Sequence, residues 1–178
     1  VITIKQGYSS NEAKKLLHKH RIEKLIVTNS QRQCLGLITV KDIEKSEKFP
    51  LASKDKKKSL LVGAAVGVGL DGVSRAKALM DANCDFLVVD TAHGHSLAVI
   101  DTVKKIRSIN SKITLIAGNI ATEEAAIELA KLKVNAVKVG IGPGSICTTR
   151  VVAGIGVPQF SAIVNVKRGL KRFKDVKL

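Results

Sequence analysis

The second part of the chain alternates short apolar runs with amphipathic segments. Apolar or β-branched runs occur at residues 61–66, 86–90, 114–118 and 136–140, and segments with helical periodicity occur at 74–83, 97–109, 122–132 and 161–173. Strands that are continuously apolar and alternate with helices are typical of a parallel sheet, because each parallel return needs a crossover. The pattern therefore predicts an α/β fold with a parallel sheet that is covered on both faces.

Each predicted strand is followed by a polar or glycine-rich sequence, at residues 67–69, 90–96, 118–119 and 140–150. The carboxyl ends of parallel strands meet at one edge of a sheet, so function is expected at that edge. A (β/α)8 barrel and an open doubly wound sheet both have this property, and the pattern alone leaves both open.

The length of the chain limits how much of a barrel it can form. A complete (β/α)8 barrel takes about 250 residues, whereas the whole chain has 178 residues. We therefore expect a partial barrel of about four central βα units at residues 60–178, truncated at both ends, in a chain that is a fragment. Residues 175–178 are expected to begin a further strand.

The first 48 residues predict a strand, a helix, two strands and a second helix. Ser9 and Glu12 have the spacing of a capping box that opens a helix ending near His20. The strands 25–28 and 34–39 are joined by a polar turn, and Thr39 with Asp42 is expected to start the second helix. Residues 1–48 are thus predicted to form a separate small segment.

Residues 49–59 are predicted to link the two parts. This stretch begins beside Pro50 and contains the run Lys54 to Lys58, so it is too polar and too charged to supply a core.

Composition narrows the class of protein. Apolar residues make up 45% of the chain, which is enough for a globular core, and the formal net charge is +15. Such a charge is also found in nucleic-acid-binding proteins, but here the lysines are spread over the predicted helices and only 3% of residues are aromatic. We therefore expect no dedicated nucleic-acid partner.

We find no apolar run of the roughly 20 residues needed to cross a bilayer and no secretory signal, so we expect a cytoplasmic protein without a membrane partner.

The three cysteines have different surroundings. Cys34 and Cys84 lie beside apolar runs and are expected to be inert thiols in the core, and the spacings fit neither a disulfide framework nor a zinc knuckle. Two histidines, His93 and His95, follow one strand, but they have no third ligand nearby in sequence, and we reject a zinc site.

Cys147 lies in the glycine-rich segment Gly140-Ile-Gly-Pro-Gly-Ser-Ile-Cys-Thr-Thr-Arg150. Lone cysteines are often small buried hydrophobic residues. Here hydroxyl side chains and Arg150 surround the thiol, which favours the thiolate and makes the sulfur a nucleophile. Residue spacing alone leaves both interpretations open.

Several motifs together resemble one family. They are Val62-Gly-Ala-Ala-Val-Gly67, Asp90-Thr-Ala-His-Gly-His-Ser96, Ala117-Gly-Asn-Ile-Ala-Thr122, Val137 to Arg150 with the glycine-rich segment, and Gly154-Ile-Gly-Val-Pro-Gln159. Residues 61–165 resemble the central barrel of bacterial-type inosine-5′-monophosphate (IMP) dehydrogenases. Residues 1–45 resemble half of the inserted CBS-pair domain of that family, with its second CBS motif at residues 36–43.

The resemblance implies oxidation of IMP to XMP with NAD. Cys147 would attack C2 of the purine and form a covalent thioimidate, which water would hydrolyse, with Thr149 beside the reacting carbon. Ser145 would contact the substrate phosphate. The residues that would bind NAD are Asp90, Gly140, Ile141 and Gly142. Without the resemblance, the aspartate would be interpreted as a helix cap.

The resemblance also implies a monovalent cation, usually K⁺, held by the backbone carbonyls of Gly142, Gly144 and Cys147. The alternative is an ordinary glycine turn without an ion.

Thr39 and Asp42 match CBS residues that hold a nucleotide ribose, or they form only a helix cap.

The family forms homotetramers, so a homotetramer is expected for the full-length parent. Its water-activating residues lie outside this chain, and we expect the 178-residue chain alone to be inactive and poorly folded.

Two alternatives remain. GMP reductases, which convert GMP to IMP with NADPH, have a similar cysteine loop, although residues 151–158 and the CBS-like segment favour a dehydrogenase. A non-catalytic remnant that senses nucleotides is the other alternative.

Overall fold

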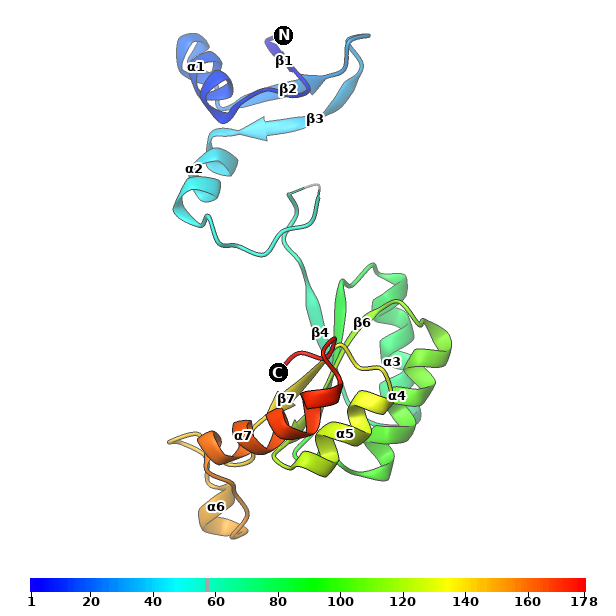
Figure 1. Ribbon diagram of the computed structural model, residues 1–178. Coiled ribbons are helices and arrows are strands. Elements are labelled where there is room, and N and C mark those ends of the chain that lie inside the picture. Colours follow the sequence, from blue (N-terminus) through cyan, green and yellow to red (C-terminus); the bar gives the residue numbers. More distant parts are fainter. Residues whose placement is uncertain (57) are drawn as a thin grey trace. The chain divides into compact units, whose positions relative to one another are not determined.

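The computed structural model describes residues 1–56 and 58–178, and the chain forms two compact units, Val1–Leu60 and Leu61–Leu178 (Figure 1). Residue 57, which belongs to the predicted linker and to its lysine run, lies outside the described residues.

The first unit is a three-stranded sheet with two helices. Its elements are β1 (Thr3–Lys5), α1 (Ser10–His20), β2 (Lys24–Thr28), β3 (Cys34–Thr39) and α2 (Val40–Lys48). Strand β2 lies in the centre, parallel to β1 and antiparallel to β3. Leu17, Leu25 and Ile43 are buried in a small core. The predicted order of strands and helices is confirmed.

Both predicted capping boxes are present. The Ser9 hydroxyl accepts the Glu12 N–H, and the Glu12 carboxylate accepts the Ser9 N–H. Thr39 and Asp42 make the same reciprocal bonds at the start of α2, with 2.7 Å between the threonine Oγ1 and an aspartate oxygen. Each helix thus begins where a local side chain satisfies its first free N–H groups.

The second unit is built on a four-stranded sheet. In chain order its elements are β4 (Gly63–Val66), α3 (Gly69–Asp81), β5 (Phe86–Asp90), α4 (Leu97–Ile109), β6 (Thr114–Ile120), α5 (Glu123–Lys131), β7 (Ala136–Val139), α6 (Thr149–Val152), α7 (Gln159–Gly169) and a 3₁₀ turn at Leu170–Arg172. All neighbouring strands are parallel, in the order β4-β5-β6-β7. The order of these strands contains no reversal, so they have no switch point of the doubly wound kind.

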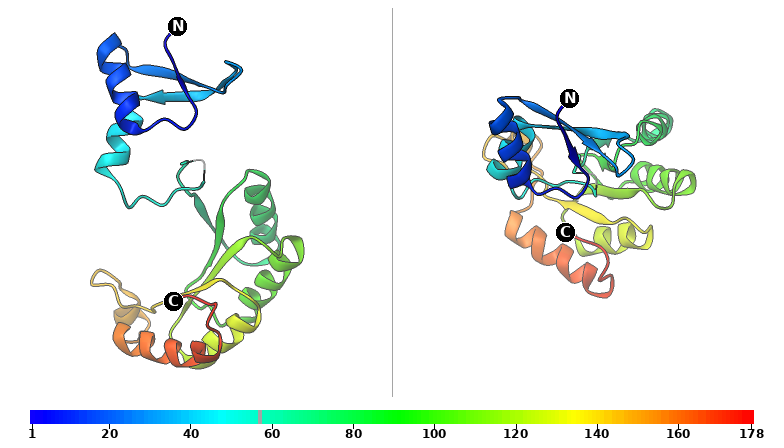
Figure 2. Two further views of the ribbon diagram at one scale, coloured as in Figure 1. Left: turned by 45° about the horizontal axis from the view of Figure 1, so that its top comes forward. Right: turned by 90° about the horizontal axis from the view of Figure 1, so that it is seen from above.

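Only one face of this sheet is covered by helices, so the prediction of two covered faces is wrong (Figures 1 and 2). Leu87, Val89 and Leu115 are fully buried beneath the helices, whereas Asp90 and Lys138 are exposed. Consecutive strands joined by right-handed crossovers all place their helices on the same side. The opposite face, called the open face below, therefore carries the side chains that alternate with the buried ones.

Helix α3 begins five residues earlier than its predicted start at residue 74. Its N-cap, Val68, offers no side-chain acceptor. The Gly69 N–H instead donates to Oγ1 of Thr102 on α4 at 3.0 Å, and that hydroxyl donates to the Ala98 carbonyl at 2.7 Å. A buried threonine on a neighbouring helix thus takes the place of a local cap.

The end of the chain lies beside β7. Val137 N–H donates to the Lys177 carbonyl and Lys177 N–H donates to the Asn135 carbonyl, both at 2.9 Å. The bridge between Ala136 and Lys177 is parallel. This pairing confirms the predicted strand-like start at residues 175–178.

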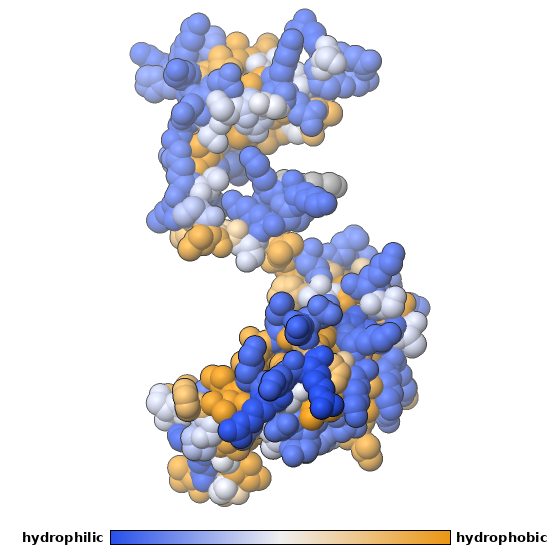
Figure 3. All heavy atoms as spheres, viewed as in Figure 1, coloured by the Kyte–Doolittle hydropathy of each residue, from blue (hydrophilic) through white to orange (hydrophobic). Residues whose placement is uncertain are grey.

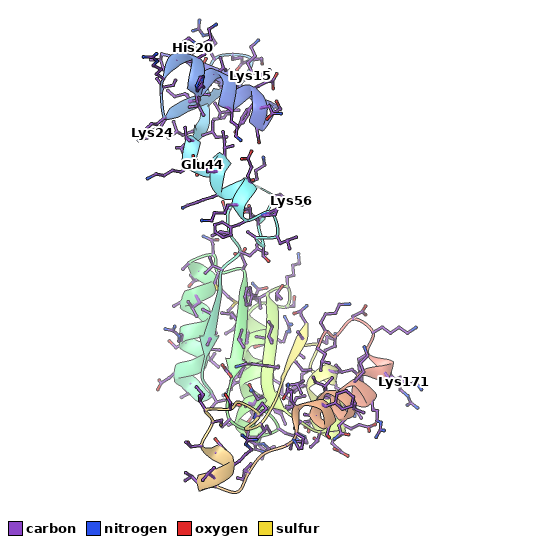
Figure 4. All side chains as sticks on the ribbon, turned by 90° about the vertical axis from the view of Figure 1, so that its left-hand side faces the viewer. Lys15, His20, Lys24, Glu44, Lys56 and Lys171 are labelled. Carbon is purple, nitrogen blue, oxygen red and sulfur yellow. The ribbon has the colours of Figure 1, made fainter. Side chains whose placement is uncertain are left out.

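Lysines are distributed over both units, as their spacing in the sequence indicates. Figure 4 shows Lys15 on α1, Lys24 on β2 and Lys171 on the 3₁₀ turn, and all three are exposed. Within the described residues, every helix is too short or too polar to span a membrane.

Candidate active site

The loops at the carboxyl edge of the large sheet are joined to one another by backbone hydrogen bonds. Thr91 N–H donates to the Gly118 carbonyl, Asn119 N–H donates to the Thr91 carbonyl, and Gly94 N–H donates to the Asn119 carbonyl, each at 2.8 Å. The segment after β5 is therefore held against the end of β6.

Two side-chain amides fix the end of β7, where the cysteine loop begins. Asn119 Nδ2 donates to the Gly140 carbonyl at 2.9 Å, and Gln159 Nε2, from the start of α7, donates to the Val139 carbonyl at 3.1 Å. Gly140 N–H also donates to the Ile120 carbonyl. The carbonyl of Val139, the last residue of β7, and that of Gly140, which follows it, are thus held from two different elements.

The loop itself needs glycine at two points. Gly140 has a φ of 132° and Gly142 a φ of 66°, values that residues with a Cβ rarely adopt. The loop returns to the sheet through a hydrogen bond from Val157 N–H to the Ile141 carbonyl at 2.9 Å. Its outer part exposes apolar side chains around α6 (Figure 3), namely Ile146, Val151, Val152 and Ile155.

Cys147 is partly exposed at the start of this outer part. Its N–H donates to the Gly144 carbonyl at 3.1 Å, and its Sγ lies 3.3 Å from Thr149 Oγ1. The hydroxyl of Thr149, then its backbone N–H, and finally the charge of Arg150 lower the pKa of the Cys147 thiol. The structure therefore favours the interpretation as a nucleophile over that as a buried core residue.

The other two cysteines differ from this one and from each other. Cys84 is partly buried against the core, and its Sγ lies 3.2 Å from the Phe86 carbonyl. Cys34 is exposed, so its predicted place in the core is wrong. It begins β3, an edge strand whose first four residues are exposed because the core of this unit lies against β2 and the helices.

Asp90 is the last residue of β5 and does not cap a helix. The N-cap of α4 is Ser96, whose hydroxyl accepts the Val99 N–H. Both carboxylate oxygens of Asp90 accept hydrogen bonds from Lys138 Nζ, at 2.8 and 2.9 Å. Within residues 1–56 and 58–178, the Asp90 carboxylate accepts no hydrogen bond from a backbone N–H, and it lies on the open face, near the carboxyl edge.

Oδ1 of Asn119 is a buried acceptor at this edge of the sheet. It has no hydrogen-bond partner in the part of the chain that the structure describes. It belongs to a residue at the end of β6, between the strands that carry Asp90 and the cysteine loop. Hydroxyl and amide groups, such as those of NAD, are donors that would satisfy it.

One of the three carbonyls expected to hold K⁺ already accepts two hydrogen bonds. The Gly144 carbonyl already accepts the Cys147 N–H and a guanidinium N–H of Arg150 at 3.3 Å. The positive charge of Arg150 therefore lies where a cation would bind, and the arrangement does not fit K⁺ as it stands.

The histidines after β5 do not form a metal site. His95 Nε2 lies 2.6 Å from a carboxylate oxygen of Glu128 on α5, and His93 is exposed. Among residues 1–56 and 58–178, the histidines, cysteines and acidic residues form no group of three that could hold a metal ion.

The predicted site residues thus lie on the loop that follows β7 and at the end of β5, with β6 between these two strands. Gly140, Ile141, Gly142, Ser145, Cys147 and Thr149 share the loop, with Ser145 and Thr149 exposed, and Asp90 ends β5. Sequence reasoning missed Lys138, Asn119, Gln159 and the short helix α6. One signal was available, because Lys138 is a lysine inside an otherwise apolar strand.

Comparison with known proteins identifies similar sequences. Residues 25–178 match the family described as IMP dehydrogenase / GMP reductase domain. Inosine-5′-monophosphate dehydrogenases of Rhizobium tropici and Bacillus subtilis are 53% and 55% identical over 165 and 163 residues, which is 93% and 92% of this chain. The chain spans about a third of the length of these relatives, 33% in both cases.

Solved structures of similar proteins include a GMP reductase from Trypanosoma brucei in complex with guanosine 5′-triphosphate. It has a TM-score of 0.80 and 41% sequence identity, and the match covers 99% of this chain and 42% of that one. A second structure of this reductase, of a variant with guanosine 5′-monophosphate, has a TM-score of 0.79 over 37% of that chain.

Proposed function

Since the chain belongs to the IMP dehydrogenase / GMP reductase family, we propose that it carries the catalytic cysteine of an enzyme that oxidises IMP to XMP. The overall reaction is IMP + NAD⁺ + H₂O giving XMP + NADH + H⁺. The observation that carries the proposal is the partly exposed Cys147 thiol with a lowered pKa, on a glycine-rich loop at the carboxyl edge of a parallel sheet.

The proposed chemistry begins at the sulfur. The Cys147 thiolate adds to C2 of the hypoxanthine ring and forms a carbon–sulfur bond. NAD supplies the acceptor for the hydride that leaves C2. Water then attacks the resulting thioimidate, the carbon–sulfur bond breaks, and XMP and the thiol are released.

Two hydroxyls of the loop support this step in the proposal. Thr149 stabilises the thiolate, since its hydroxyl lies 3.3 Å from the sulfur. Ser145, two residues before the cysteine and exposed, binds the substrate phosphate.

The cofactor would be held by Asp90, Gly140, Ile141 and Gly142. Ribose hydroxyls would donate to the Asp90 carboxylate, which ends a strand at the same edge. The open backbone of the glycines would allow the cofactor to approach the loop closely.

We further propose that β4 to β7 are four successive strands of a (β/α)8 barrel. The sequential strand order and the single helix-covered face support this, because a barrel wall has both properties. The first unit, Val1–Leu60, is proposed to be half of a CBS pair, and its order of strands and helices is compatible with that assignment.

The remaining proposals rest on the family alone. They are a homotetramer of the full-length protein, a cytoplasmic location and a K⁺ site at the carbonyls of Gly142, Gly144 and Cys147. K⁺ binding there would require Arg150 to leave the Gly144 carbonyl. That the chain is inactive when expressed alone also stays a prediction.

A GMP reductase is the second candidate. The structural similarity to the Trypanosoma brucei reductase favours it, with a TM-score of 0.80. The higher identity to dehydrogenases, 55% for the Bacillus subtilis relative against 41% for this reductase, favours IMP oxidation.

The test uses a chimera, because the chain spans 33% of its Bacillus subtilis relative. In this chimera the residues of the present chain replace the matching segment of that relative, and folding is checked by circular dichroism. We expect NADH formation from IMP and NAD, and loss of it in Cys147→Ala. Cys34→Ala, which removes an exposed thiol of the first unit, is the matched control and should stay active.

Other outcomes would identify the alternatives. Consumption of NADPH with GMP, and no reaction with IMP, would show a reductase. A folded chimera that binds IMP but catalyses neither reaction would support the non-catalytic remnant. Mass spectrometry of the Cys147 peptide, after quenching during turnover with IMP and NAD, should show a nucleotide adduct, and its absence would contradict covalent catalysis.

A further inference from the structure

Asp90, Gly118 and Lys138 form a row across three strands. In the register of the sheet, Asp90 of β5 pairs with Gly118 of β6, and Gly118 pairs with Lys138 of β7. The two charged side chains lie on the open face and meet above the glycine, with Lys138 Nζ 2.8 and 2.9 Å from the two carboxylate oxygens. The ion pair therefore spans two strand spacings, about 9 to 10 Å of sheet.

The glycine makes this reach possible. A Cβ at position 118 would lie only 2.7 Å from the Cβ of Lys138 and would also collide with the Lys138 carbonyl. A side chain there would fill the space above β6 through which Lys138 of β7 reaches Asp90 of β5. A lysine, with four methylene groups, is long enough to cross a bare strand.

Stability alone is a weak explanation for this pair. The side chains of Lys138 and Asp90 are 46% and 40% exposed, and exposed ion pairs contribute only about 0 to 1 kcal/mol to stability. The position of the pair is more informative. The pair lies on the open face. It joins the end of β5 to β7, the strand that leads into the cysteine loop.

We propose that Lys138 is the positioning residue for Asp90 in cofactor binding, an inference that rests on the proposed function. A carboxylate has about four acceptor positions, of which the lysine uses two. The remaining positions stay free for two ribose hydroxyls, and the lysine fixes the plane in which they lie. Its charge also offsets repulsion between the carboxylate and the phosphates of NAD.

The proposal predicts a defined kinetic change in the chimera. Lys138→Met should raise KM for NAD about tenfold, the size of one lost charge-assisted hydrogen bond, while kcat changes less than about threefold. The Kd for NAD, measured by calorimetry with IMP present in the inactive Cys147→Ala background, should rise by the same factor. KM for IMP should stay the same. Lys138→Arg, which can pair with both carboxylate oxygens, should restore most of the loss. Lys104→Met, at an exposed lysine of α4, is the matched control and should have no effect.

A double-mutant cycle with Asp90→Asn separates positioning from a merely structural role. If Lys138 acts through Asp90, Lys138→Met should change KM for NAD less than about twofold in the Asp90→Asn background. The following outcomes apply if the chimera oxidises IMP. An equal change in KM for NAD in both backgrounds, or an unchanged KM for NAD in Lys138→Met, would overturn the proposal. A folded chimera that does not oxidise IMP would instead contradict the proposed function, and with it this inference.

Discussion

Cys147 Sγ and Thr149 Oγ1 lie 3.3 Å apart, with one residue between them in sequence. The cysteine ends the glycine-rich turn and the threonine begins α6 (Thr149–Val152), so the geometry of the turn brings the hydroxyl to the sulfur. Hydrogen bonds from Thr149 are the largest cause of the lowered pKa of the thiol. The groups that lower the pKa of Cys147 are thus its immediate neighbours in the sequence.

Thr149→Val should slow alkylation of Cys147 by iodoacetamide. Valine keeps the shape of threonine but removes the hydroxyl, so the pKa of the thiol rises and the thiolate fraction at neutral pH falls. Well below the pKa the rate follows the thiolate fraction, so alkylation of Cys147 should be slower in the variant at the same pH. The rate of alkylation is measured by mass spectrometry across a range of pH. The pH at which this rate reaches half of its maximum should be higher in the variant.

Two controls accompany this measurement. Cys34, an exposed thiol in the other unit, should react at the same rate in both proteins. Thr148→Val removes another hydroxyl of the same loop. Within the described residues this hydroxyl makes no hydrogen bond to Cys147, so the pH profile should not change. An unchanged profile in Thr149→Val would show that the hydroxyl does not stabilise the thiolate.

Local signals in the sequence predicted most of the elements. The capping boxes at Ser9 and Thr39 correctly placed the starts of α1 and α2, because the bonds involved span only three residues. The apolar runs correctly placed β4 to β7, and the periodicity placed α4 at Leu97–Ile109. Predictions of this kind succeed where the stabilising contacts are close in sequence.

Features that depend on distant residues were missed. The early start of α3 depends on Thr102, 33 residues away from Gly69. The partner of Asp90 is 48 residues away, and Asn119 and Gln159 reach β7 from two other elements. The site loop was therefore predictable as a motif, whereas the contacts that hold it in place were not.

Gly118→Ala should weaken the sheet between β6 and β7. The new methyl group would collide with Lys138, and overpacking of this kind typically costs about 1 to 3 kcal/mol. Hydrogen exchange of peptides from β6 and β7 in the chimera should become about five- to a hundredfold faster. Gly67→Ala is the control, since nothing lies within 4 Å of a Cβ there. Equal exchange in both variants would contradict the steric role of Gly118.

Asn119→Ala should loosen the start of the cysteine loop. The substitution removes the hydrogen bond from Nδ2 to the Gly140 carbonyl, which typically contributes about 0.5 to 1.5 kcal/mol. We expect faster hydrogen exchange in residues 140–150 and a lower kcat in the chimera. Asn11→Ala, at an exposed position of α1 in the other unit, is the matched control. A lower kcat without faster exchange would show that Asn119 acts by contact with a ligand and not by holding the loop.

Thr102→Val should destabilise the first turn of α3. The threonine is 1% exposed, and valine fills the same volume but cannot accept the Gly69 N–H. A lost hydrogen bond that leaves a donor unpaired costs about 1 to 3 kcal/mol. The Gly69 amide should therefore exchange at least about fivefold faster, while amides in α5 stay unchanged. Thr114→Val, at an exposed threonine of β6, is the control. Unchanged exchange at Gly69 would mean that α3 begins there without help from α4.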